Sequence, residues 1–366
     1  MKKMLSLFML AILTLVGCSQ GEEEVKETIK VAMVTDSGSL DDKSFNQASW
    51  EGVQQFASKH SEVETQYVQP KGESLQDYLD AINNLVLTGN QVIVMPGFKF
   101  EETANIVAQE YPEIKFILID GQPLDGKEYV SHDNVVSIYF TEHEAGFLAG
   151  IASALQTQTG KLAFVGGYPI MSVDKFGIGY TAGVAYANKN LGTDAQVVDY
   201  VHAGSFTDVD AGKMIAAGLY DKGVDIIHAA AGGVGVGVYT EAKTRAENGE
   251  DVYAVGVDVD QYAEGVISNG KSIMLTSAMK RLDVAVATHL EYWLNDEFKG
   301  GEVITMDFQQ EGVGLPTENP NLTESTLIEL EKVKEDLAKG EIVVPSTQEE
   351  LIDFLDEYGY DHSDLF

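Results

Sequence analysis

The chain has 366 residues, of which 44% are hydrophobic and 22% are charged, and its 24 basic against 58 acidic side chains give a formal net charge of −34. This composition is typical of a globular protein and excludes a disordered, collagen-like or many-span membrane protein. We expect no nucleic-acid partner, because binding nucleic acid needs clustered Lys and Arg to neutralise phosphates, and the sequence has no basic stripe. At about 100–200 residues per domain, the length predicts two lobes.

The N-terminus has the pattern of an export signal. Lys2 and Lys3 form a charged head, and the apolar stretch from Met4 to Val16 follows. This stretch is too short to span a bilayer as a helix, which takes about 20 residues, and it is typical of a signal peptide.

The only cysteine of the chain, Cys18, closes the run LTLVGC, which resembles a bacterial lipobox. The alternative is an ordinary signal peptide with a chance cysteine. We expect residues 1–17 to be removed, Cys18 to carry the lipid and residues 18–28 to form a flexible tether. The protein would then be anchored by lipid to the bacterial cell membrane and face outside.

Beyond the tether, short β-branched runs alternate with longer amphipathic stretches, which predicts βαβ units. Near-continuous apolar runs indicate strands that are buried on both faces of a parallel sheet. The expected strands of the first half are 29–35, 64–67, 92–95, 115–120 and 135–139. The expected strands of the second half are 161–166, 195–201, 225–229, 253–258 and 272–276.

The helices follow from apolar periodicity and start signals. We expect helices at 44–60, 77–88, 146–155, 179–188, 283–298 and 324–338, and a further strand at 303–308. Asp41 and Asp42 can accept from free amides where the first helix starts. Ser346, followed by Glu349 and Glu350, predicts a capping box at the start of the last helix.

Each lobe is expected to combine two separate stretches of the chain. The predicted N-terminal lobe comprises residues 29–139 plus about 283–305, and the predicted C-terminal lobe comprises residues 140–282 plus about 306–345. Residues 346–366 form an acidic C-terminal helix in this prediction.

Ligands of open α/β sheets bind at the carboxyl ends of the strands. Acids, glycines, aromatic residues and one lysine stand at these ends in the predicted sheets. In chain order they are Asp36, Met95 to Gly97, Asp120, Gly166 to Tyr168, Ser205 to Asp208, Gly232 to Gly237, Asp258 and Lys280.

Motifs for catalysis and cofactors are missing. A single cysteine excludes a thiolate metal site, and neither HExxH nor GxSxG occurs. The run GVISNGKS (265–272) matches a phosphate loop formally, but it has no strand before it or helix after it, so it reads as a helix-to-strand turn. The run GGVGVG (232–237) lacks dinucleotide spacing and is either a packing turn or a backbone contact to a small ligand. We therefore expect that the protein binds no cofactor or metal and is not an enzyme.

One segment carries the most information, VTDSGSLDDKSFNQASWEG from Val34 to Gly52. Together with FILID (116–120), EAGFLAG (144–150), GSFTD (204–208), VGVDVDQ (255–261) and TSAMKR (276–281), it resembles the basic membrane protein family of lipoproteins. That family includes the purine nucleoside receptor of spirochaetes and nucleoside-binding subunits of ABC importers. The resemblance extends from Ile29 to Glu350.

The resemblance implies the type I periplasmic-binding-protein fold, in which two doubly wound lobes joined by a three-strand hinge close on a ligand. The resemblance also implies the nucleoside contacts. Phe45 and Phe206 would stack on the base, with Phe176 as a further aromatic candidate, and Asp36, Asn46 and Asp120 would bind the base edge. Asp258, Lys280 and the Gly232 amide would bind the ribose. The alternative roles are core packing for the aromatic residues, helix caps for Asp36 and Asp120, and a structural Asp258–Lys280 ion pair.

The implied function is a lipid-anchored substrate-binding protein that captures nucleosides, purines first, for an ABC importer. Its partners would be the nucleoside, the permease subunits and the membrane through Cys18, and the protein would be a monomer. A sugar or other small solute is the alternative ligand, and a nucleoside-hydrolysing enzyme is a further alternative. GYPIMSV (167–173) departs from the commonest family form and leaves purine against pyrimidine open.

Overall fold

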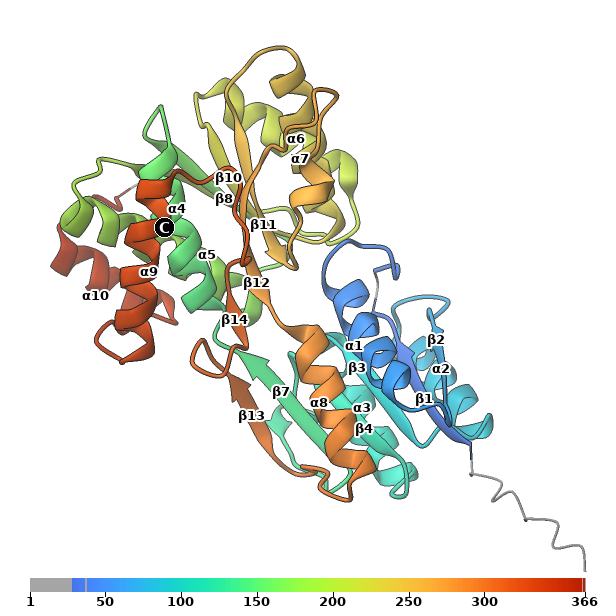
Figure 1. Ribbon diagram of the computed structural model, residues 1–366. Coiled ribbons are helices and arrows are strands. Elements are labelled where there is room, and N and C mark those ends of the chain that lie inside the picture. Colours follow the sequence, from blue (N-terminus) through green and yellow to red (C-terminus); the bar gives the residue numbers. More distant parts are fainter. Residues whose placement is uncertain (1–27, 37, 364, 366) are drawn as a thin grey trace, which may run out of the picture.

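Figure 1 shows a computed structural model, which describes residues 28–36, 38–363 and 365. Two six-stranded sheets, each between helices, form two lobes. The predicted signal peptide, Cys18 and most of the predicted tether lie outside the described residues. Within the described part of the chain, no helix is both long and apolar enough to cross a membrane.

The sheet of the first lobe is parallel throughout. Its strands, in spatial order, are β13 (Val303–Met306), β7 (Val135–Phe140), β4 (Lys115–Ile119), β3 (Val92–Pro96), β1 (Ile29–Val34) and β2 (Val63–Val68). Helices α1 (Phe45–Lys59) and α8 (Leu282–Leu294) pack against each other on one face. Helices α2 (Leu75–Leu87) and α3 (Glu101–Glu110) cover the other face. Both faces are therefore buried, which explains the uninterrupted apolar runs of the strands.

The second sheet repeats this arrangement. Its strands are β14 (Val313–Gly314), β12 (Met274–Lys280), β11 (Tyr253–Asp258), β10 (Ile226–Ala230), β8 (Lys161–Gly166) and β9 (Gln196–His202), and only the β12–β14 pair is antiparallel. Helices α4 (Glu142–Gln156) and α5 (Met171–Leu191) cover one face, and α6 (Val209–Asp221) and α7 (Gly233–Glu247) cover the other.

Glycines bring α4 and α5 into close contact. A Cβ on Gly179 would lie 1.9 Å from the carbonyl oxygen of His143, and a Cβ on Gly150 would lie 2.1 Å from that of Tyr180. Larger residues would therefore push the two helix backbones apart. The small residues that the sequence shows at these positions fix the place of α5, which carries Phe176 toward the cleft.

The chain passes between the lobes three times, from β7 to α4, from β12 to α8 and from β13 to β14. This confirms the predicted fold of two doubly wound lobes with three connections. The C-terminal helices α9 (Glu324–Ala338) and α10 (Gln348–Tyr358) pack on the second lobe, α9 against α4 and α10 against α5. Short elements complete the chain: the 3-10 helices η1 (Phe98–Phe100) and η2 (Tyr262–Gly265), and the hairpin of β5 (Leu124–Asp125) and β6 (Glu128–Tyr129).

Several predicted element boundaries were wrong. Helix α5 begins at Met171, eight residues before its predicted start, and β12 continues to Lys280 instead of ending at Thr276. Helices α3 and α6 had not been predicted. The last helix is capped by Thr347 and not by Ser346, because Thr347 lies three residues before Glu350 and exchanges both capping bonds with it.

The phosphate-loop match proved to be the predicted turn. Residues 265–272 join η2 to β12, and no helix follows them. Backbone amides at a helix start, which a phosphate loop requires, are therefore lacking at this position.

A polar and aromatic cleft between the lobes

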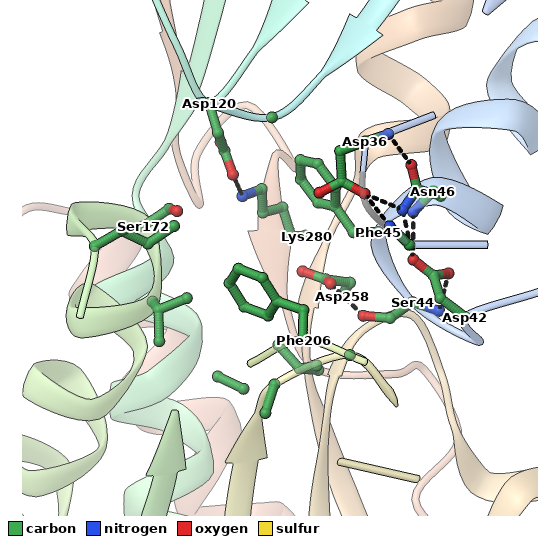
Figure 2. Close-up of a pocket in the computed structure, with 18 of the residues that line it drawn as sticks. Asp36, Asp42, Ser44, Phe45, Asn46, Asp120, Ser172, Phe206, Asp258 and Lys280 are labelled. Carbon is green, nitrogen blue, oxygen red and sulfur yellow. Dashed lines mark hydrogen bonds and ion pairs between the residues drawn. The ribbon is translucent and has the colours of Figure 1, made fainter. Parts of the chain in front are cut away.

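A cavity lies where the carboxyl ends of both sheets face each other. About 670 Å³ of the space between its lining residues is free of protein atoms, and part of this space is open to solvent. Figure 2 shows its side chains converging from both lobes. All nine residues that the sequence predicted as ligand contacts line it, namely Asp36, Phe45, Asn46, Asp120, Phe176, Phe206, Gly232, Asp258 and Lys280.

Asp36, which follows β1, is held by its neighbours. Its Oδ1 accepts hydrogen bonds from the Gly38 amide (2.7 Å) and from Asn46 Nδ2 (2.9 Å). Its Oδ2 has no hydrogen-bond partner among the described residues. Burial raises the pKa of this carboxyl. Asp36 therefore presents one open acceptor to a ligand.

Asn46 is engaged mainly with the protein. Its Nδ2 donates to Asp36 and also to Asp42 Oδ2 (3.0 Å), and its oxygen accepts from the Asp36 amide (3.2 Å). Only one lone pair of the amide oxygen remains for the ligand contact that the sequence predicted. Its principal visible role is to orient Asp36.

Asp42 organises the start of α1, as the sequence predicted. Its Oδ1 accepts from the Ser44 and Gln47 amides (3.0 and 3.2 Å), and its Oδ2 accepts from the Asn46 amide (2.8 Å). Asp41 instead accepts from the Ser39 hydroxyl (2.6 Å). By satisfying the free amides of the helix start, Asp42 fixes the first residue of α1, Phe45, at the cavity.

The aromatic residues divide into two kinds. Phe45 and Phe206 come from different lobes, are partly exposed and project into the cavity (Figure 2). Phe176 is 3% exposed, and its ring packs edge-on against His228 with centroids 6.0 Å apart. Phe176 thus forms part of the cavity floor as well as of the core.

Gly167 determines where the Phe206 ring lies. A Cβ on Gly167 would be 2.2 Å from Cε1 of Phe206, so any larger residue would displace the ring. The Phe206 carbonyl also accepts from the Gly233 amide (2.8 Å), which ties the loop to the start of α7. Beside it, the N–H of Gly232 has no hydrogen-bond partner within the described chain and is free to donate to a ligand.

Lys280 is the cation of the cleft and is 2% exposed. Its ammonium donates to Asp120 and to Glu142 Oε1 (3.0 Å). Its Nζ lies 5.1 Å from the ring centroid of Phe45 and 5.0 Å from that of Phe140. The three carboxylates around it raise its pKa, so it stays charged. One of its three N–H groups remains for a ligand.

Glu142 was missed by the sequence prediction. It opens α4, is 1% exposed and lies 3.6 Å, through Oε2, from the ammonium of Lys175. A signal existed, because Glu142 stands just beyond the end of β7, the kind of position at which the other acids had been found. Burial raises the pKa of this carboxyl.

Asp120 and Asp258 occupy matching positions in the two lobes. Each follows or ends a central strand, and their φ angles of +54° and +64° lie in the left-handed region. Such backbone conformations cost about 1–3 kcal/mol and persist mainly at functional sites. Asp120 Oδ1 is buried and has no hydrogen-bond partner among the described residues, which leaves it open to a ligand donor.

Asp258 is not paired with Lys280, so the structural ion pair considered from the sequence is absent between these two residues. Its Oδ2 accepts from the hydroxyl of Ser44 in the other lobe, and no described residue bonds its Oδ1. Burial raises the pKa of Asp258 to about 6, against the opposing effect of Lys280. The cavity therefore offers three open carboxylate oxygens, which suit a neutral ligand rich in N–H and O–H donors.

The fold is shared with solute-binding proteins. A solved ABC transporter solute-binding protein from Aeropyrum pernix is 26% identical, with a TM-score of 0.75 over 90% of this chain and 97% of its own. This likeness, together with two α/β lobes around a cleft, places the chain in the class of ABC transporter substrate-binding proteins.

The family follows from sequence. The sequence model of the protein family described as "ABC transporter substrate-binding protein PnrA-like" matches residues 29–348, so the chain belongs to this family. The CD4+ T-cell-stimulating antigen of Listeria innocua is 35% identical, over 89% of this chain and 90% of its own length. The ABC transporter nucleoside-binding protein BmpA of Lactococcus lactis is 32% identical, over 92% of this chain and 96% of its own. The predicted family is confirmed.

Proposed function

We propose that the protein captures nucleosides, with purine nucleosides preferred, and delivers them to an ABC permease. The observation that carries this proposal is the pairing of two aromatic rings from opposite lobes, Phe45 and Phe206, with open carboxylate oxygens around them. Aromatic rings bind the faces of flat bases, and each stacked base gains about 1–3 kcal/mol on single-strand platforms. The relative from Lactococcus lactis named as nucleoside-binding supports the same ligand.

The polar groups suit the two halves of a nucleoside. Asp36 and Asp120 would accept from N–H groups on the base edge, with Asn46 in support. Asp258 would accept from a ribose hydroxyl, while Lys280 and the Gly232 amide would donate to ribose oxygens. Because the cation is already paired with two carboxylates, a phosphate would meet mainly negative charge.

Titration calorimetry of the full chain in detergent tests this function. Guanosine, adenosine, inosine, cytidine, ribose and guanosine monophosphate form the panel, and chromatography checks for release of free base. We expect micromolar or tighter binding of purine nucleosides and binding of the monophosphate that is weaker by at least about tenfold, since a tenfold change needs only about 1.4 kcal/mol. Binding of ribose alone would favour the sugar alternative, and release of free base would favour the enzyme.

Binding is expected to weaken in acid. Burial raises the pKa of Asp258 from 3.8 to about 6, and a ribose hydroxyl needs the ionised carboxylate as acceptor. Between pH 3.8 and about 6 the folded chain binds the Asp258 proton more tightly than the unfolded chain does. The contribution of Asp258 to folding stability therefore falls as the pH rises toward 6, whereas the affinity for the nucleoside rises. Calorimetry from about pH 5 to about pH 8 measures the second effect.

Asp258→Asn is the control for this pH dependence. Its affinity should be lower at neutral pH and its pH profile flatter near pH 6. Asp36, whose pKa is also raised by burial, titrates in both proteins, so the difference between the profiles isolates Asp258. Equal slopes would assign the pH dependence to another group.

We also propose that Cys18 is lipidated after removal of residues 1–17, which would place the protein at the outer face of the cell membrane. Wild-type protein is expected in the membrane fraction of cells, and Cys18→Ser in the soluble or secreted fraction. Mass spectrometry of the N-terminal peptide should show an acylated Cys18. An unmodified cysteine would contradict the anchor.

A further inference from the structure

Two neighbouring residues before α1 bond directly to the second lobe. The backbone carbonyl of Lys43 accepts from Gln261 Nε2 (2.7 Å), and the hydroxyl of Ser44 donates to Asp258. Figure 1 shows the loop before α1 reaching toward the second lobe. The two bonds join segments of different sheets, so both must break when the lobes separate.

The first-lobe side of these contacts is shaped for them. The Ser44 amide is bound by Asp42 Oδ1 (3.0 Å), and Ser44 is 1% exposed. Lys43 has a φ of +59°, an unusual conformation for a residue with a side chain. The loop thus presents the Lys43 carbonyl and the Ser44 hydroxyl in fixed positions.

Gln261 is equally fixed on the second lobe and is 2% exposed. Its Oε1 accepts from the Val257 amide and from the Tyr239 hydroxyl, each at 2.8 Å. The backbone N–H of Gln261 donates to Ser277 Oγ (3.1 Å). With the oxygen engaged inside its own lobe, the carboxamide turns its NH₂ group to the other lobe.

We propose that Lys43 and Ser44 with Asp258 and Gln261 form a latch that holds the lobes closed, and that Gln261 is a positioning residue that sets how long a ligand is retained. Gln261 does not line the cavity, so it acts on the ligand only through closure. The Ser44 bond occupies one oxygen of Asp258 and turns the other to the ligand, which couples closure to ligand contact. The ligand half of this inference rests on the proposed function, whereas the latch itself does not.

Gln261→Glu tests the latch with almost no change of shape. Its carboxylate still accepts from Val257 and Tyr239, but the group that replaces Nε2 is an oxygen that faces the Lys43 carbonyl and repels it. Dissociation of radiolabelled guanosine from the full chain in detergent, at about pH 8, should accelerate roughly 2- to 10-fold, the range of one ordinary hydrogen bond. The association rate should change less than the dissociation rate.

Tyr239→Phe is the matched control, since it removes one hydrogen bond to the Gln261 oxygen but keeps the bond from the Val257 amide, which still directs Nε2 to the other lobe. It should lower stability and leave guanosine dissociation near the wild-type rate. Equal acceleration in both variants would show that Gln261 has only a structural role inside its lobe and would overturn the latch.

A second measurement needs no ligand. Leu87 and Met214 are 83% and 76% exposed on different lobes, and both can be changed to cysteine for spin labels in a Cys18→Ser background. In the ligand-free protein, the distances between the two labels should include a short distance that corresponds to closed lobes. Gln261→Glu should lower the population at this distance. Identical distance distributions would overturn the latch even if guanosine binds. If guanosine fails to bind the wild type, the proposed function fails, and the distance distributions still decide the latch.

Discussion

Lys280→Met is expected to destabilise the protein by about 3–5 kcal/mol, the cost of removing one partner from a buried ion pair. The ammonium of Lys280 is surrounded by Asp120 and Glu142, and both acids are less than a tenth exposed. Methionine fills a similar volume but leaves the buried Asp120 without this cation and Glu142 with only the Lys175 ammonium, 3.6 Å away. Urea unfolding at neutral pH, followed by circular dichroism, measures the loss.

The acids distinguish this mechanism from simple misfit of the methionine. If unpaired charge is the cause, Asp120→Asn and Glu142→Gln added to Lys280→Met should recover part of the lost stability. The recovery should be largest at neutral pH and smaller in acid, where the Glu142 carboxyl, whose pKa burial raises, becomes protonated. No recovery in the triple variant would show that packing, and not charge, explains the loss.

A surface ion pair of this chain provides the control. Lys222 contacts Asp199 at 2.7 Å, but its side chain is 63% exposed. Lys222→Met should change stability by less than about 1 kcal/mol, because exposed pairs are screened by water and salt. Similar losses for Lys222→Met and Lys280→Met would contradict the argument from burial.

The sequence predicted the fold because parallel α/β proteins bury both faces of each strand. Runs such as 92–95 and 116–119 are apolar throughout, which is typical of strands buried on both faces, and the restart at Lys161 indicates the second lobe. Boundaries were harder where helices begin without a capping residue. Helix α5 starts after Ile170, which makes no side-chain cap bond, so no start signal in the sequence marks its first turns.

The sequence predicted which residues line the cleft but not which of them contact one another. Strand-end positions follow from local pattern, and all nine chosen residues line one cavity. Which acid meets Lys280 depends on how the two lobes face each other, and no local spacing encodes that. Lys280 therefore contacts Asp120 and Glu142, while Asp258 meets Ser44 from the opposite lobe.

The same limit explains why Gln261 had no predicted role beyond its place in a family motif. Gln261 lies 218 positions from Lys43 along the chain but only 4 positions from Val257. Contacts such as the one with Lys43 exist only when the lobes are closed. Sequence pattern therefore locates the groups that line the cleft, and the three-dimensional arrangement shows which groups join the two lobes.

Phe45→Ala is expected to weaken guanosine binding at least about tenfold, because loss of a base-stacking ring costs about 1–3 kcal/mol and about 1.4 kcal/mol is one factor of ten. The ring is the first of α1 and is partly exposed in the cavity. Its removal should leave the fold intact, since the amides of the helix start remain bound by Asp42. Calorimetry gives the affinity, and thermal unfolding without ligand checks the fold.

Two further variants separate stacking from general apolar contact. Phe45→Leu keeps much of the buried volume but has no aromatic face, so it should bind guanosine nearly as weakly as Phe45→Ala, whereas Phe45→Trp should retain most of the affinity. Phe176→Leu changes a buried ring and should affect unfolding more than binding. If Phe45→Leu binds guanosine like the wild type, the Phe45 ring only fills space, and base stacking does not account for the affinity.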